Sequence, residues 1–118
     1  MKEINFKINN HKWEIKLRPK VEMLEIYKCI DEEAIDCFGL TLRQFNAIYI
    51  NEDLCYDEQI KTLKHELTHC FIWEYGYYYV DFNNEETICE FVASINDFIN
   101  DVIRKVKRWI NESNWFIK

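Results

Sequence analysis

The stretch HELTH at residues 65–69 has the form H-E-x-x-H, and the rest of the chain is interpreted around it. If residues 58–75 form a helix, the two histidines lie about one turn apart and project from the same face. Two imidazoles placed in this way can bind one metal ion. We therefore predict that His65 and His69 are ligands of one Zn2+ ion per chain and that Glu66 is the catalytic general base.

The residues around the motif support a helix. Asp57 is a suitable N-cap, and Gly76 is a suitable stop signal. The alternative is a surface helix with two exposed histidines, but the motif lies on an amphipathic helix, as its chemistry requires. Apolar residues recur at helical spacing on the side opposite the histidines, at Ile60, Leu63, Leu67, Cys70 and Phe71.

Length and composition predict one domain, residues 1–118. The chain has 118 residues, of which 48% are hydrophobic, so it can bury a substantial core. Its formal net charge of −6 disfavours binding to nucleic acid through a broad basic face. No basic amphipathic segment indicates a membrane surface. The expected partner is a protein or peptide substrate, with no nucleic acid and no membrane, and the oligomeric state is left open.

Cysteine usage predicts a reduced protein. The chain has five cysteines and no C-x-x-C pair, so a cysteine zinc site has little support. Cys70 and Cys89 are expected on buried helix faces. The N-terminus does not resemble a signal peptide and no apolar run approaches 18 residues. We therefore expect a cytoplasmic protein.

The N-terminal third is predicted to form strands. Apolar residues alternate on both sides of Asn9-Asn10, which predicts a β-hairpin over residues 3–17. Residues 21–37 fit a short helix or a strand, and we favour a strand or irregular segment. Two further strands are expected at Ala34–Leu40 and Ala47–Ile50.

A second long helix is predicted to start at Asn83 or Asn84, because apolar residues then follow the helical period as far as Ile110. The segment Trp115–Ile117 is expected to pack back on the body. The predicted fold class is α+β: one compact domain in which a small N-terminal sheet packs on the metal-binding helix and on the second helix.

A zinc site needs a third protein ligand. His11, at the predicted hairpin turn, is expected to be hydrated rather than metal-bound. The longer motif with a third histidine fails, because Ile72 and Tyr75 occupy its glycine and histidine positions. A carboxylate is therefore expected.

The best carboxylates lie at the start of the second helix. Glu86 and Glu90 are four residues apart and share one face, so one can bind the metal and the other can accept the free N–H of a ligating imidazole. Alternatives stay open. Glu85 or Glu90 can be the ligand, and Glu86 can instead close a capping box with Asn83.

These two motifs resemble the gluzincin arrangement of thermolysin, H-E-x-x-H followed by E-x-x-x-D. The fuller strings at residues 62–69 and 85–93 are similar to small phage-encoded and bacterial proteins related to the ImmA/IrrE metallopeptidases, over roughly residues 34–100. The resemblance implies a zincin core inside a bacterial or phage-infected cell. It also implies Glu86 as third ligand and Glu90 in the supporting position, where thermolysin has Asp.

The implied reaction is peptide-bond hydrolysis by a zinc metalloendopeptidase, with a zinc-activated water and Glu66 as the base. A further donor is needed for the oxyanion of the intermediate. Tyr77, Tyr78 and Tyr79 are candidates because they follow the metal-binding helix, and aromatic packing is their alternative role.

Zincins pair an extended substrate with an edge strand near this helix. By that resemblance, the segment Ile48-Tyr49-Ile50 is a candidate for docking a peptide by strand addition, unless it is an interior strand. An alternative function is a catalytically inactive zinc-binding phage protein that acts through protein–protein contacts. A purely structural zinc site is another alternative.

Overall fold

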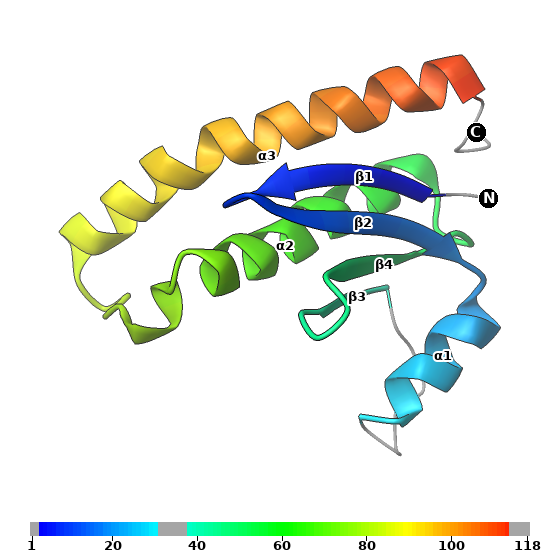
Figure 1. The fold of residues 1–118 in the computed structure, drawn as a ribbon, viewed down its shortest axis with the longest axis horizontal. Coiled ribbons are helices and arrows are strands. Elements are labelled where there is room, and N and C mark those ends of the chain that lie inside the picture. The colour runs from blue at the N-terminus through cyan, green and yellow to red at the C-terminus, as the bar shows by residue number, and fades with distance from the viewer. Residues whose placement is uncertain (1–2, 31–37, 114–118) are drawn as a thin grey trace.

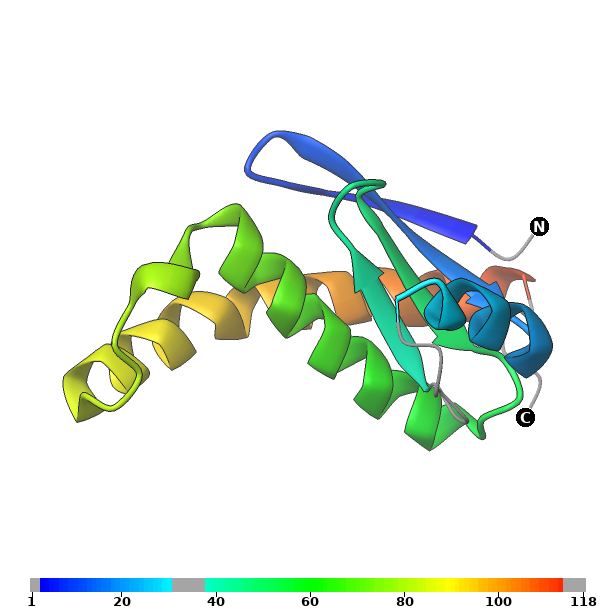
Figure 2. The ribbon, with the colours of Figure 1, turned by 90° about the horizontal axis from the view of Figure 1, so that it is seen from below.

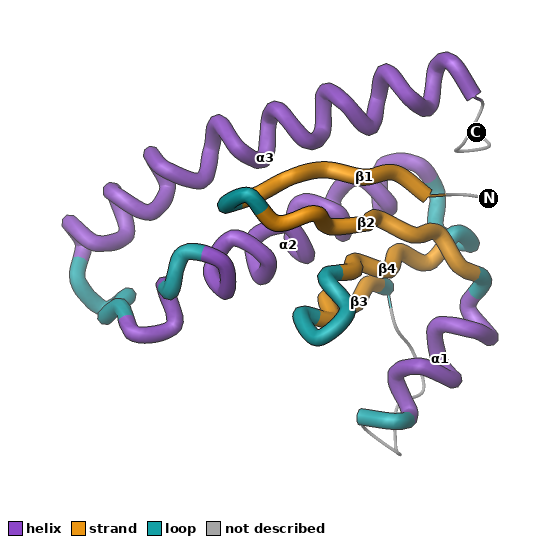
Figure 3. The backbone as a smooth tube through the Cα atoms, in the orientation of Figure 1, coloured by secondary structure: helices purple, strands orange, loops and turns teal. Residues whose placement is uncertain are grey.

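A computed structural model describes residues 3–30 and 38–113 of the chain (Figures 1 and 3). The elements in chain order are β1 (Glu3–Ile8), β2 (His11–Arg18), α1 (Lys20–Lys28), β3 (Gly39–Leu42), β4 (Ala47–Asn51), α2 (Tyr56–Glu74), the 3-10 turn η1 (Tyr77–Tyr79) and α3 (Glu85–Ser113). One mixed sheet and three α-helices within these residues confirm the predicted α+β class.

The four strands lie in the order β1-β2-β4-β3. β1 and β2 form the predicted antiparallel hairpin. Asn9 and Asn10 both adopt positive φ, 51° and 63°, as the tight turn of such a hairpin requires. β2 pairs in parallel with β4, and β4 pairs antiparallel with β3. The sheet thus continues from the hairpin to the strands that lie beside α2, the helix with the H-E-x-x-H motif.

One face of the sheet carries the core. Side chains alternate along a strand, so Ile4, Phe6 and Ile8 of β1 point to the same face and are all buried. α2 and α3 run side by side in opposite directions on that face, as the two perpendicular views show (Figures 1 and 2). The buried cluster joins Trp13, Ile15, Leu17, Ile48 and Ile50 of the sheet to Leu63, Leu67 and Phe71 of α2 and to Ile95, Val102 and Val106 of α3.

α1 corrects the prediction of a strand or irregular segment over residues 21–28, where the short helix that the sequence also fitted forms instead. Pro19 precedes the helix, where its missing N–H is no loss, and the backbone N–H of Lys20 donates to Asp53 at 3.1 Å. Met23 is the one fully buried residue of α1, so the sequence carries little helical period there. Residues 31–37 lie outside the described part, which leaves the predicted strand at 34–40 tested only at its end, where β3 begins.

α2 is the predicted metal-binding helix, and it begins two residues earlier than expected. Cys55 rather than Asp57 occupies the N-cap position. The five residues of the predicted apolar stripe, from Ile60 to Phe71, are all buried. The helix ends at Glu74, and Gly76 follows with a φ of 74°, so the predicted stop is confirmed.

α3 begins after Asn84, whose side-chain Oδ1 accepts a hydrogen bond from the backbone N–H of Thr87 at 3.3 Å. Ile88 and Val92 are 43% and 54% exposed, which shows that the first turns of α3 extend beyond the core. Cys89 is likewise exposed, so its predicted burial is wrong. The predicted packing of residues 115–117 lies outside the described part. None of the helices in that part has the length and apolarity needed to cross a bilayer.

The hairpin holds the end of α2 through the side chain of Glu74, which is only 5% exposed. The indole N–H of the fully buried Trp13 donates to Glu74 Oε2 at 2.6 Å, and His11 Nδ1 lies 2.7 Å from Oε1. The side-chain amide of Asn9 donates to the backbone carbonyl of Glu74. The last turn of α2, and with it the direction of the helix, is therefore tied to the sheet.

We expect Glu74→Ala to lower the free energy of unfolding by about 2 kcal/mol, because it leaves the buried indole N–H of Trp13 without an acceptor. Urea denaturation followed by circular dichroism measures the change. Glu25→Ala, which removes an exposed carboxylate from α1, is the matched control. Equal stability of the two variants would contradict the role assigned to Glu74.

Candidate metal centre

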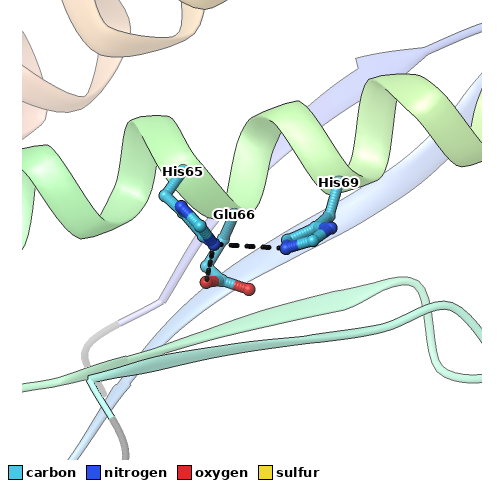
Figure 4. Close-up of side chains that lie close together, drawn as sticks. All are labelled: His65, Glu66 and His69. Atoms are coloured by element: carbon cyan, nitrogen blue, oxygen red, sulfur yellow. Dashed lines mark hydrogen bonds and ion pairs between the residues drawn. The ribbon is translucent and has the colours of Figure 1, made fainter. Parts of the chain in front are cut away.

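His65 and His69 lie on the side of α2 that faces β3. Their Nε2 atoms are 3.2 Å apart, and both side chains are exposed. Figure 4 shows both rings and the Glu66 carboxylate gathered below the helix, over the strands and away from α3. The predicted one-turn spacing therefore brings the two imidazoles together on an accessible surface.

This spacing fits a shared zinc ion. Two imidazole nitrogens that bind one tetrahedral zinc ion are about 3.3 Å apart, given the usual zinc–nitrogen distance. His65, Glu66 and His69 form the candidate site that we call the metal group. Their ligand atoms all lie within 4.8 Å of one another. Within the described residues, this is the one group of three or more histidine, cysteine or acidic side chains with such geometry.

Glu66 differs from the histidines in its burial, since it is only 7% exposed. The Thr41 hydroxyl lies 2.8 Å from Glu66 Oε1, to which it donates, and 3.2 Å from the backbone carbonyl of the same residue. Glu66 Oε2 points towards the metal group, 3.9 Å from His65 Nε2. β3 thus holds one carboxylate oxygen in place and leaves the other beside the histidines.

Gly39 allows β3 to approach α2 this closely. A Cβ atom at position 39 would lie 2.6 Å from Thr62 Cγ2 and 2.9 Å from Glu66 Cγ. Both distances are shorter than real Cβ atoms tolerate, so a larger residue at this position would force Thr62, Glu66 or the strand itself to shift. The absence of a side chain at Gly39 is what lets Thr41 reach Glu66.

Two cavities adjoin the metal group, and each includes His65, Glu66, Tyr27 and Gly39. The first, about 390 Å³, continues along the start of α2 and is also lined by Phe38, Glu58, Lys61 and Thr62. The second, about 330 Å³, continues along the end of α2 and is also lined by Leu40, Thr41, Arg43, His69, Trp73 and Tyr78. His65 and Glu66 therefore lie where the two cavities adjoin, and together the cavities form an open groove beside β3.

The structure does not bring Glu86 or Glu90, the predicted third ligand and its supporting residue, into this group. Both are exposed residues of the first turns of α3, and neither lines a cavity at the histidines. The reason is packing: α3 covers α2 from the other side, and its first turns extend beyond the core (Figures 1 and 4). Glu85 is also exposed there, and Asn84 rather than Asn83 caps the helix, so the capping box does not form.

His11 and Cys70 also stay outside the metal group. His11 Nδ1 lies 2.7 Å from Glu74 Oε1 at the C-terminal end of α2, so this histidine contacts protein rather than water alone, and its predicted exclusion from the zinc ligands stays a prediction. Cys70 follows His69 in sequence but points into the core. Burial, with a smaller effect from the negative charge of Glu74, raises the pKa of its thiol, which keeps it protonated.

The three consecutive tyrosines occupy different environments. Tyr77 is half-buried against Phe71 and Phe91, as the aromatic alternative predicted. Tyr79 is 96% exposed and lines neither cavity. Tyr78 alone of the three lines the cavity beside His69. Only one of the predicted oxyanion donors is therefore near the metal group.

The candidate docking segment is an interior strand, which is the alternative that the sequence left open. Ile48, Tyr49 and Ile50 belong to β4, which is hydrogen-bonded to β2 on one side and to β3 on the other. An interior strand has no free edge for a peptide. β3 is the edge strand next to the metal group, because it is the last strand in the order of the sheet.

Several residues of the groove have no signal in the sequence. Thr41 and Gly39 are isolated residues of a short strand, and nothing local shows that they face Glu66. Arg43 and Trp73 are thirty positions apart. Their proximity to the histidines depends on the pairing of β3 with β4 and on the packing of α2 against β3.

Comparisons of the chain with protein-family models, with curated proteins and with solved structures found no match. The resemblance to the ImmA/IrrE metallopeptidases therefore stays a prediction from the two motifs. Of those motifs, the structure gathers the residues of H-E-x-x-H and leaves the second carboxylate motif apart.

We expect Gly39→Ala to destabilise the protein by about 1–3 kcal/mol, because the new methyl group overlaps Thr62 and Glu66. Thermal unfolding of four proteins checks this: wild type, Gly39→Ala, Thr62→Ser and the double variant. Thr62→Ser removes the Cγ2 atom nearest the new methyl, so it should relieve part of the loss in the double variant. Strictly additive effects would show that β3 and α2 are not in the described contact.

Proposed function

We propose that this chain is a zinc-dependent hydrolase of peptide bonds, with His65 and His69 as metal ligands and Glu66 as the general base. The observation that carries the proposal is one constellation. Two Nε2 atoms lie 3.2 Å apart beside a buried carboxylate that Thr41 holds in place. An open groove extends on both sides of this constellation.

Zinc supplies Lewis acidity at such a site: it lowers the pKa of a water molecule and polarises a carbonyl oxygen. The imidazoles of His65 and His69 are the ligands that α2 provides, and their distance suits that ion. Among the described residues, Glu66 is the one carboxylate that lies with them.

Glu66 suits the role of general base because its two oxygens have different surroundings. The hydroxyl of Thr41 donates to Oε1, which fixes the plane of the carboxylate. Oε2 faces the histidines and can take a proton from the attacking water. The same oxygen can then return the proton to the leaving amine. Burial of the side chain limits its contact with bulk water during this transfer.

Tyr78 is the best candidate to stabilise the oxyanion. It is the tyrosine of the η1 turn that shares a cavity with His69. A peptide extended along β3 would cross the metal group from one cavity to the other, since β3 lines both. Pairing of the peptide with the edge strand β3, rather than with β4, would then orient the scissile bond.

We expect one zinc ion per chain, with His65→Ala and His69→Ala each weakening zinc binding at least about a hundredfold by loss of a ligand. Competition with a chromophoric chelator measures the affinity. Glu86→Gln is the matched control, because the structure keeps Glu86 away from the group. An equal loss in Glu86→Gln would restore Glu86 as the third ligand and contradict the described position of α3.

We expect Glu66→Gln to keep zinc and to lose peptide hydrolysis by at least about a hundredfold, because the amide cannot accept the proton. The substrate for this test is a mixture of synthetic peptides, with new termini detected by mass spectrometry. The variant also separates hydrolysis from the alternative role in protein–protein contacts. Cleavage or biological function that survives in zinc-loaded Glu66→Gln protein would rule out the proposed base.

A further inference from the structure

The cavity beside His69 contains a cation held against an aromatic ring. Arg43 starts the turn between β3 and β4, and its guanidinium carbon lies 3.5 Å from the centroid of the Trp73 ring. Trp73 lies one helical turn after His69 on α2 and therefore projects from the same side. Both residues line the cavity that contains His69 and Glu66. The stacked pair is therefore part of the groove.

The contact with Trp73 leaves the N–H donors of Arg43 available to a ligand. The guanidinium carbon lies over the indole at van der Waals distance, and a guanidinium that stacks on an aromatic ring in this way keeps its N–H donors in its own plane, at the edge of the contact. Tyr78 packs edge-on against Trp73, with ring centroids 5.7 Å apart, and this contact limits the movement of the indole. The contact with Trp73 thus restricts the orientations open to the donors before any ligand binds.

Arg43 has no anionic partner within the described part of the chain. Arg18 and Arg104, in contrast, each donate to a carboxylate, Glu3 at 2.7 Å and Asp101 at 2.9 Å. The chain as a whole carries a formal net charge of −6, so an uncompensated cation in its groove is a local exception. Such a cation favours a ligand that brings its own negative charge.

We propose that Arg43, supported by Trp73, is a specificity determinant that binds a carboxylate of the peptide substrate at the His69 end of the groove. This inference rests on the proposed peptidase function and adds to it a class of substrate. A carboxylate suits a guanidinium, because the planar group can donate two parallel hydrogen bonds to the two carboxylate oxygens. The carboxylate belongs either to an acidic side chain or to the C-terminus of the peptide.

The test uses zinc-loaded full-length protein and matched synthetic peptides. One series carries Glu or Gln at successive positions, and a second ends in a free carboxylate or in a carboxamide. Relative kcat/KM values follow from depletion of each peptide in a mixture. We expect wild type to favour the acid over the amide at least about tenfold in one series, as a charge-assisted hydrogen bond predicts. The series that shows the preference identifies the source of the carboxylate.

Arg43→Gln should bring that ratio close to one, and Arg43→Lys should keep only part of it, because an ammonium group lacks the planar fork. Arg108→Gln removes the same charge from an exposed position of α3 and should leave the ratio unchanged. An acid-to-amide ratio near one in wild type, or an unchanged ratio in Arg43→Gln, would overturn the inference while peptide hydrolysis itself stands.

A binding measurement separates this inference from the proposed function if no peptide is cleaved. Indole N–H signals are recorded by NMR during titration with three probes: N-acetylglutamate α-amide, N-acetylglutamine and N-acetylglutamine α-amide. The Trp73 signal, assigned from the spectrum of Trp73→Phe, should shift with a probe that carries a carboxylate and not with the neutral one. The shift should be absent in Arg43→Gln. No carboxylate-dependent shift in wild type would overturn the inference.

Discussion

The close contact between β3 and α2 at Gly39 is the constraint on which the candidate site depends. A strand can approach a helix this closely only where no side chain intervenes, and a Cβ atom at Gly39 would overlap both Thr62 and Glu66. Because the strand lies so near, the Thr41 hydroxyl reaches the carboxylate of Glu66. The same approach makes β3 a wall of the groove that contains both histidines.

α2 has one side that packs in the core and an opposite side that carries the histidines. Its apolar stripe packs on the sheet and on α3, and this burial supplies the driving force that holds the helix in place. The opposite side carries the histidines, which stay exposed and accessible. Glu66 lies between these sides, where it is buried but still has a hydrogen-bond partner, as a buried carboxylate requires. Its neighbour Thr62 is buried at the contact with β3.

The position of α3 follows from the same division. α3 needs an apolar partner for residues such as Val102 and Val106, and the sheet and the apolar stripe of α2 provide it. Packing there places α3 across α2 from the histidines, so the carboxylates at its start do not reach them (Figure 4). The cation in the groove comes instead from the turn after β3, where Arg43 stacks on Trp73 of α2. Charge at the site is therefore distributed along β3 and α2.

The sequence by itself determined the features that depend on local spacing. Alternation around Asn9-Asn10 specified the hairpin, and the helical period specified α2 and α3 together with the side of α2 that carries His65 and His69. These features follow from one residue's position relative to its near neighbours. α1 is an exception, because it buries only Met23 and its sequence therefore has no clear apolar repeat at helical spacing. Only the tertiary structure decided that β4 is interior, that Glu86 lies apart, and that Thr41, Arg43 and Tyr78 share the groove with Glu66. These relations arise from strand pairing and from packing between distant segments, which no local pattern encodes.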